Sequence, residues 1–271
     1  MTKTRSAATS GARRVLMILY EFPPLGGIGM SRNVRNVQHL PRHGWTPVVI
    51  TPRDASTSRV DADSLRLVPD GVAIVRTRLV GPRELHRAAA VAKAASGRAR
   101  RVAIALGLGS GAPPPRRGEA EGTACPDEAE ALDRHAAPDL PSRIRRFLFF
   151  PDEAVGWVPF AIAGAMAARR PIPCDAIFST SHPVSAHLVA GVAKCLTGLP
   201  WVAELRDPWL GNRLTESVYG ARPWLHRRLQ FKIERWIARS ADELVCVTPS
   251  LARMYQRRYP AATITVIPNG Y

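Results

Sequence analysis

The sequence predicts an α/β fold in which a parallel sheet carries helices on both faces. Three observations support this prediction. Val15 to Tyr20 is a short apolar run with the length and β-branched content of a buried strand in a parallel sheet. A glycine-rich loop follows this run. From residue 175 to residue 267, short apolar runs then alternate with helical segments, which is typical of consecutive βαβ units.

The glycine-rich loop, here called the glycine loop, contains Gly26, Gly27 and Gly29, and a helix is expected to begin near residues 31–33. Because glycine lacks a β-carbon, the backbone can approach an anion closely, and free N–H groups at a helix start favour negative charge. Arg32 occupies the place of the third glycine of a dinucleotide-binding loop. The loop therefore predicts either contact with a phosphate or a turn that needs only glycine torsions.

Two further strands are expected before residue 80. Pro47 to Thr51, with the apolar run Val48 to Ile50, form the second strand after a first helix that ends near His43, and Gly71 to Arg76 form the third. Asp54 follows the second strand, where a nicotinamide-dependent enzyme would bind ribose, but its polar neighbours are typical of a turn. Both interpretations of Asp54 remain open from the residues alone.

Two segments are expected to lie outside the sheet. Residues 1–13 are basic and polar without the apolar core of a signal peptide, so we interpret them as a flexible tail before a domain over 14–271. Residues 83–143 are rich in alanine and arginine and then in glycine and proline. This composition predicts a variable, partly disordered insertion, because it buries little apolar surface. Its arginines fit either a solvated tract or contact with anionic lipid or nucleic acid.

The second half of the chain is expected to alternate regularly between helices and strands. The predicted helices are 153–170, 184–196, 222–239 and 249–259, and the predicted strands are 175–180, 201–205, 243–247 and 263–267. The third of these helices has an apolar stripe, with arginine and lysine on the rest of its surface. The stripe consists of Leu225, Leu229, Ile233, Trp236 and Ile237. Such a stripe favours packing against the sheet, and binding to a membrane surface is the alternative.

Candidate site residues follow the predicted strands, because ligands of a parallel sheet bind at the carboxyl ends of its strands. His182 follows the fourth strand and can hydrogen-bond a hydroxyl or a phosphate, or merely pack or cap a helix. Arg206 follows the fifth strand and offers a bidentate fork to phosphate or carboxylate. Asp207 can accept hydrogen bonds from sugar hydroxyls, orient Arg206, or form an internal salt bridge with it. We expect these residues and the glycine loop to face one crevice.

The formal net charge of +16, which arginine supplies almost entirely, predicts attraction to an acidic partner such as an anionic membrane surface or a phosphorylated substrate. Nucleic acid is not expected, because no recognition motif or aromatic stacking platform accompanies the charge. The four cysteines are scattered without the spacing of a metal site, and no Walker sequence or Ser-His-Asp order is present. No apolar run is long enough to cross a bilayer, so a cytoplasmic protein is expected.

Six groups of residues together suggest a family. They are Phe22-Pro23-Pro24-x-Gly26-Gly27-Ile28-Gly29, Gly44-Trp45 before the second strand, Pro151-Asp152 with Trp157 and Pro159, Ser179-Thr180-Ser181-His182-Pro183, Pro200-Trp201-Val202-Ala203-Glu204-Leu205-Arg206-Asp207-Pro208-Trp209, and Ile267-Pro268-Asn269-Gly270-Tyr271. With these motifs, the chain resembles the amino-terminal domain of glycosyltransferase family 4, the retaining enzymes of GT-B architecture. The resemblance covers most of the chain outside the tail and the insertion.

The resemblance implies a Rossmann-like domain, one half of a GT-B architecture, that carries the acceptor site. It implies hexosyl-type transfer from a nucleotide-sugar to a glycan or lipid-linked acceptor in polysaccharide or cell-envelope biosynthesis, with no cofactor and no metal. The glycine loop would lie near the donor phosphates and the acceptor. Arg206 and Asp207 would hold the acceptor or orient the reaction, and His182 would line the same crevice. The excess of arginine fits a lipid-linked acceptor at the inner membrane face, with the protein peripheral to it.

In this family a second domain holds most of the nucleotide-sugar and carries two glutamates separated by seven residues. No two glutamates of this chain have that spacing, and the sequence given ends at Tyr271. We therefore expect this chain to lack the donor-binding domain and to be inactive in transfer on its own. Two alternatives remain open: a non-catalytic basic Rossmann-like module that binds anionic lipid or nucleotide, and an NAD-dependent oxidoreductase. The oligomeric state is not predicted.

Overall fold

The computed structural model describes residues 13–26, 28–53, 60–81, 149–210 and 224–270. All the helices and strands reported below belong to one unit, which residues 1–81 and 151–271 form, and residues 82–150 form a second unit. The predictions for the insertion, for Gly27 and for Asp54 therefore lie outside the described residues, as does most of the predicted tail. Arg13, assigned to the tail from the sequence, is the first residue of a strand.

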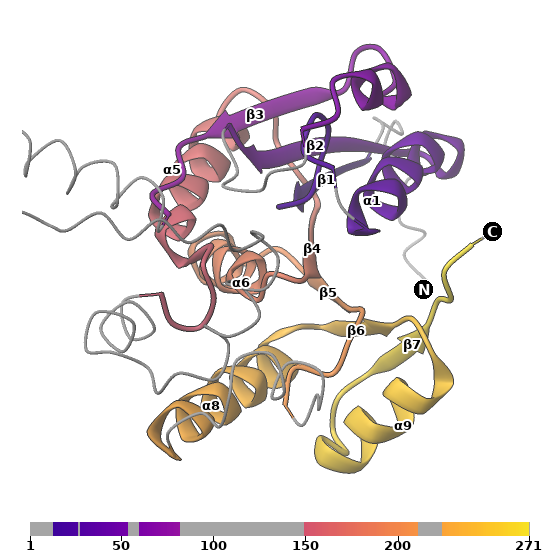
Figure 1. The fold of residues 1–271 in the computed structure, drawn as a ribbon. Helices are drawn as coiled ribbons and strands as arrows, with labels where there is room; N and C mark the ends of the chain where they lie inside the picture. Colours follow the sequence, from indigo (N-terminus) through magenta and orange to yellow (C-terminus); the bar gives the residue numbers. More distant parts are fainter. Residues whose placement is uncertain (1–12, 27, 54–59, 82–148, 211–223, 271) are drawn as a thin grey trace, which may run out of the picture. The chain divides into compact units, whose positions relative to one another are not determined.

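The described residues of the first unit form a seven-stranded sheet in the order β3-β2-β1-β4-β5-β6-β7 (Figure 1). Its strands are β1 Arg13–Ile18, β2 Trp45–Pro52, β3 Ala73–Thr77, β4 Ala176–Ser181, β5 Trp201–Leu205, β6 Glu243–Cys246 and β7 Ile264–Val266. Each neighbouring pair is parallel. The predicted α/β class with a parallel, Rossmann-like sheet is therefore confirmed.

Helices cover both faces of the sheet, as predicted (Figure 1). One face carries α1, Ile28–His39, and the other carries α5, Val158–Arg169, α6, Ser185–Thr197, α8, Trp224–Ser240, and α9, Pro249–Arg258. From β1 the chain adds β2 and β3 on one side, and it then returns to β4 on the other side of β1 and adds β5, β6 and β7 outward. Because the connections are right-handed, these two directions place α1 and the later helices on opposite faces of the sheet. Three short 3₁₀ helices complete the set: η1 Leu40–His43, η2 Asp63–Leu67 and η3 Val155–Trp157.

The central strand β1 contributes to two apolar cores because its successive side chains point to opposite faces. Leu16 and Ile18 pack with α5 and α6 in the larger core. Val15 and Met17 pack with α1 in the smaller one. No residue from Leu16 to Ile18 is more than 1% exposed, which explains why the strand is apolar throughout rather than alternating.

Several features differ from the sequence predictions. The predicted helix 153–170 is divided into η3 and α5, which begins at Val158. The first helix, expected to end near His43, ends at His39 and is followed by η1. Helix α1 begins at Ile28, so Gly29 lies in its first turn rather than in a loop. Leu225 is 44% exposed, whereas Leu229, Ile233, Trp236 and Ile237 are partly or fully buried. Helix α8, about 26 Å long, is longer than the five-residue strand that precedes it, about 17 Å, and its first buried residue is Gln230.

Among the residues that the structure describes, no helix combines the length and the apolar character needed to cross a membrane.

Candidate functional site

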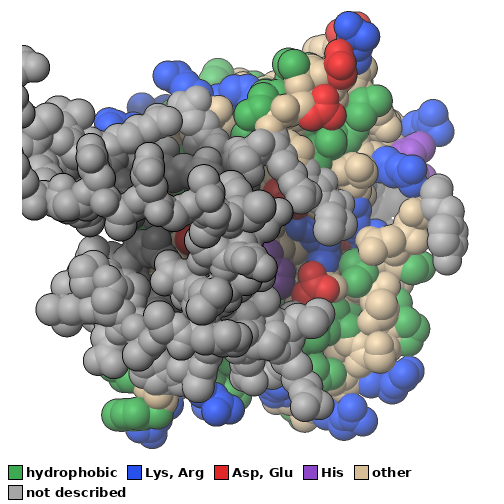
Figure 2. All heavy atoms as spheres, in the orientation of Figure 1, with side chains coloured by type: hydrophobic (Ala, Val, Ile, Leu, Met, Phe, Trp, Pro, Cys, Tyr) green, Lys and Arg blue, Asp and Glu red, His purple; other side chains and the backbone are tan. Residues whose placement is uncertain are grey.

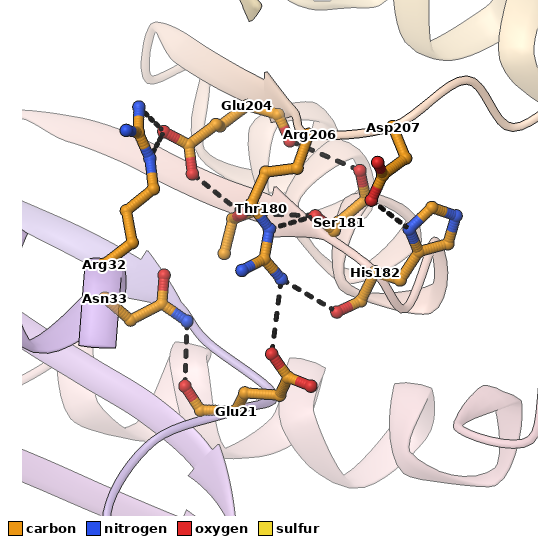
Figure 3. Close-up of polar contacts among 9 residues, drawn as sticks. All are labelled: Glu21, Arg32, Asn33, Thr180, Ser181, His182, Glu204, Arg206 and Asp207. Atoms are coloured by element: carbon orange, nitrogen blue, oxygen red, sulfur yellow. Dashed lines mark hydrogen bonds and ion pairs between the residues drawn. The ribbon is translucent and has the colours of Figure 1, made fainter. Parts of the chain in front are cut away.

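Three loops meet at the carboxyl edge of the sheet, the edge at which all its strands end. They follow β1, β4 and β5, which are neighbours in the sheet, so the first residues of the three loops lie side by side (Figure 3). The loop after β1 contributes Glu21, the loop after β4 contributes His182, and the loop after β5 contributes Arg206 and Asp207. The structure thus brings together the predicted residues His182, Arg206 and Asp207 from two different loops.

Arg206 is the residue that connects these loops. Its Nε donates to the carbonyl oxygen of Ser181 at 2.6 Å, and its Nη2 lies 3.4 Å from both Glu21 Oε2 and the carbonyl oxygen of His182. The side chain is 13% exposed. A guanidinium held on one edge by two loops is oriented before any ligand arrives, which reduces the entropy lost on binding.

The glycine loop reaches this arginine through Gly29. A β-carbon on Gly29 would overlap the guanidinium of Arg206 and the carboxylate of Glu21. Asn33, one turn further along α1, donates to the carbonyl oxygen of Glu21 at 2.8 Å and holds the loop against the helix. The N-terminus of α1 and the cationic group of Arg206 therefore lie together, an arrangement that attracts anions. Gly26 is partly buried in the loop before α1.

His182 and Asp207 form a second pair at the same edge. His182 Nδ1 lies 3.8 Å from Asp207 Oδ2, and the two side chains are 43% and 63% exposed. Loss of solvent around the ring lowers the pKa of His182 below its usual value, and the charges of Asp207 and Asp152 raise it in part. His182 is therefore neutral near pH 7, with one ring nitrogen available as an acceptor.

Asp152, to which sequence analysis assigned no role, binds the start of α6, and its charge raises the pKa of His182 in part. Asp152 Oδ1 accepts from Ser185 Oγ at 2.7 Å and from the Ala154 amide at 3.0 Å, and Oδ2 accepts from the Ser185 amide at 3.0 Å. Ser185 is the first residue of α6, so the carboxylate satisfies a free amide at the helix start. Burial raises the pKa of Asp152, and these hydrogen bonds oppose the shift. No local spacing reveals this contact, because its partners are 33 residues apart.

Glu21 was also missed, although a signal for it was present. It is the first charged residue after the apolar run from Val15 to Tyr20. The rule that selected Arg206, a charged residue just after a strand, also selects Glu21.

Arg32, in place of a third glycine, is bound to the buried carboxylate of Glu204. Its Nε and Nη2 lie 2.9 and 2.8 Å from Glu204 Oε1, and Glu204 is 2% exposed. Glu204 also accepts from Thr180 Oγ1 at 2.9 Å. The remaining donors of Arg32 reach the segment after β7, at the carbonyl oxygens of Ile267 and Pro268 and at Asn269 Oδ1, over 2.9–3.1 Å. The ion pair of Arg32 and Glu204 thus takes the place of the close packing that the third glycine of a dinucleotide-binding loop makes with the sheet.

Within the described ranges, no three His, Cys, Asp or Glu side chains are grouped as metal ligands. The ligand chemistry that this edge offers is that of Arg206, His182, Asp207 and the start of α1. These groups suit an anion beside a hydroxyl-bearing compound.

Comparisons with known proteins identify the family and the fold. The family model described as Glycosyltransferase Family 4 matches residues 116–271. No curated protein matches the sequence. Among solved structures, sucrose-phosphate synthase from Thermosynechococcus elongatus aligns with a TM-score of 0.51 at 13% identity, over 96% of this chain and 48% of that chain. Apo UGT2 from Phytolacca americana aligns with a TM-score of 0.50 at 11% identity, over 96% and 52%.

At these identities the two structures show a common fold. The chain spans about half the length of each.

Proposed function

The chain belongs to glycosyltransferase family 4, and on that premise we propose that it is the acceptor-binding half of a glycosyltransferase. The enzyme transfers a hexosyl group from a nucleotide-diphosphate sugar to a glycan or lipid-linked acceptor in polysaccharide or cell-envelope synthesis. It needs no cofactor besides the donor, and it works in the cytoplasm at the inner membrane face. The observation that carries the proposal is the position of Arg206, which lies over the start of α1 beside His182 and Asp207.

Arg206 is the group that we assign to the phosphates of the donor. When the bond between the sugar and the phosphate breaks, the nucleoside diphosphate leaves with the bonding electrons and negative charge grows on its oxygens. A cation that is already oriented, together with the free amides at the start of α1, stabilises that charge without reorganising during the reaction. Glu21 and Ser181 hold the guanidinium in place.

His182 and Asp207 are the groups that we assign to the acceptor. With Nδ1–H directed toward Asp207, the neutral ring of His182 presents Nε2 as a hydrogen-bond acceptor for the attacking hydroxyl. The exposed carboxylate of Asp207 also accepts from a further sugar hydroxyl. The acceptor oxygen bonds to the anomeric carbon as the bond from that carbon to the nucleoside diphosphate breaks, and the proton of the acceptor hydroxyl passes to Nε2 of His182.

The test is release of nucleoside diphosphate from a panel of nucleotide-sugars, with and without a lipid extract as the source of acceptor, by the full-length protein that the gene encodes. We expect one donor to be turned over only when the extract is present. Arg206→Met removes the cation and is expected to lower kcat/KM by about 100-fold. Arg257→Met, at an exposed arginine of α9, is the matched control and leaves the rate unchanged.

Two results contradict the proposal. One is a panel in which no donor is turned over in response to the extract. The other is an Arg206→Met variant as active as the Arg257→Met control.

A further inference from the structure

Helix α8 has an outer face whose composition differs from the rest of the helix. The buried side chains of α8 are Gln230, Glu234, Ile237 and Ala238, of which Glu234 is hydrogen-bonded. The exposed ones, which we call the outer face of α8, are three large apolar and five basic side chains: Trp224, Leu225, Arg227, Arg228, Phe231, Lys232, Arg235 and Arg239. We propose that this face docks on a bilayer of anionic lipid.

The apolar members of the outer face are accessible. Trp224 is 67% exposed, Leu225 44% and Phe231 43%. The guanidinium of Arg228 lies 5.4 Å from the centre of the Trp224 ring, so basic and aromatic groups lie beside each other rather than on separate faces. Tryptophan with neighbouring arginine is the pairing that membrane–water interfaces favour, because the ring enters the headgroup region while the cation binds phosphate.

No acidic side chain offsets the charge of the outer face within α8. The helix has a single acid, Glu234, which is buried. Its Oε1 accepts from Arg258 Nη1 at 2.5 Å and from the hydroxyl of Tyr259 at 2.9 Å, both on the side of α9. The charged side chains of the outer face are therefore all basic, and Figure 2 shows basic side chains along the lower part of the view, where Figure 1 places α8 and α9. This charge is complementary to an anionic bilayer.

The apolar side chains distinguish between a bilayer and nucleic acid as the partner. A phosphate backbone is bound by arginine and lysine, and the aromatic rings of such sites stack on bases. Leu225 and Phe231 offer aliphatic and aromatic surface along the same helix as the cations, which matches a helix that lies in the plane of a membrane interface. The observations therefore favour lipid.

The outer face begins at the same edge of the sheet as the candidate site. A helix that joins two parallel strands runs back from the carboxyl edge, so Trp224 and Leu225 mark the end of α8 nearer to that edge. The first buried residue of α8 is Gln230, so its first turn extends beyond the core. Docking at this end brings the candidate site close to the bilayer. The link to a lipid-linked acceptor rests on the proposed function, whereas docking itself does not.

The test is co-sedimentation of the full-length protein with vesicles of phosphatidylcholine alone and of phosphatidylcholine mixed with phosphatidylglycerol in equal parts. We expect binding to the mixed vesicles only, with a blue shift of tryptophan emission that Trp224→Phe removes. Replacing Arg227, Arg228, Lys232 and Arg235 by glutamine is expected to weaken the binding by about 100-fold or more. The double variant Trp224→Ser/Phe231→Ser is expected to weaken it by about ten-fold.

The matched control replaces four exposed arginines elsewhere, Arg42, Arg53, Arg66 and Arg170, by glutamine, which removes the same charge. Equal losses in the control and in the α8 variant would overturn the proposal, as would binding to neutral vesicles. Tight binding to duplex DNA with the same dependence on α8 would identify a nucleic acid as the partner instead. The vesicle assay contains no nucleotide-sugar and does not measure transfer. The docking proposal can therefore fail while the transfer assay succeeds, and docking can be observed while transfer fails.

Discussion

The guanidinium of Arg206 lies against Gly29, in a first turn of α1 that has no room for a β-carbon. The two residues are far apart in the sequence, one in the first turn of α1 and one directly after β5. Their contact brings the guanidinium of Arg206 next to the start of α1, so that both can bind the same anion. It also explains why a glycine, a poor helix former, stands in the second position of a helix.

Replacing Gly29 by alanine is expected to disturb the candidate site while changing the stability of the fold only slightly. Alanine stabilises a helix by about 1 kcal/mol relative to glycine, but its β-carbon displaces the side-chain ends of Arg206 and Glu21. We expect the thermal midpoint to change by less than about 4 °C, while kcat/KM for nucleoside diphosphate release falls by about ten-fold or more. The control is Ser31→Ala at an exposed position of the same helix. Equal activity of the two variants would refute the importance of the contact.

The buried pair of Arg32 and Glu204 is expected to contribute strongly to stability. Removing one partner leaves the other charge buried, so Arg32→Met and Glu204→Gln should each lower the free energy of unfolding by about 3–5 kcal/mol. The double variant leaves no unpaired charge, and its loss should be smaller than the sum of the two single losses. Urea denaturation of the four proteins completes this double-mutant cycle.

The exposed ion pair between Arg66 and Asp63 is the control for the buried pair of Arg32 and Glu204. Its side chains are 85% and 84% exposed, so Arg66→Met should change the free energy of unfolding by less than about 1 kcal/mol. An Arg32→Met variant as stable as Arg66→Met would contradict the role given to the buried pair.

His187 makes stability depend on pH. Complete burial, with smaller effects from His182 and Arg206, lowers the pKa of His187 from 6.5 to about 3. Below pH 6.5 the unfolded chain therefore binds a proton that the folded protein does not, so stability falls as the pH falls, by up to about 1.4 kcal/mol per pH unit from this group. His187→Asn keeps a partner for Ser179, which lies 2.7 Å from His187 Nδ1, but does not titrate.

The free energy of unfolding, measured from pH 7 to pH 5, should therefore fall less steeply in His187→Asn than in the natural protein, even if the variant is less stable at pH 7. The raised pKa of Asp152 acts in the opposite direction in both proteins and cancels in the comparison. Parallel curves would show that His187 is not the group responsible.

Desolvation lowers the pKa of His182, and the carboxylates around the ring oppose that shift. The charges of Asp207 and Asp152 both raise the pKa, in that order of size. We expect Asp207→Asn and Asp152→Asn each to lower the pKa of His182, and the first to lower it more. Titration of the ring protons by NMR measures both shifts, and Glu153→Gln, at an exposed neighbour, is the control without effect. A rise in the pKa in either variant would contradict the arrangement.

Local sequence was sufficient for most of the sheet. The strand from Trp201 to Leu205 has the predicted bounds, because a short apolar run stands between Pro200 and the charged pair of Arg206 and Asp207. The start of α1 was predicted three residues or more too late, because the reason for a glycine there is a contact with Arg206. Leu225 was predicted to pack because the apolar stripe of a helix does not show where the sheet beneath it ends.

By itself, the sequence determined the alternation of strands and helices, their order, and the position of His182, Arg206 and Asp207 at strand ends, since these depend on apolar periodicity over short stretches. Only the tertiary structure decided which of these residues meet. Ser185 binds Asp152 across 33 residues and Arg32 binds Glu204 across 172. Such contacts arise from the order of strands in the sheet, which brings distant loops to one edge, and no local pattern encodes them.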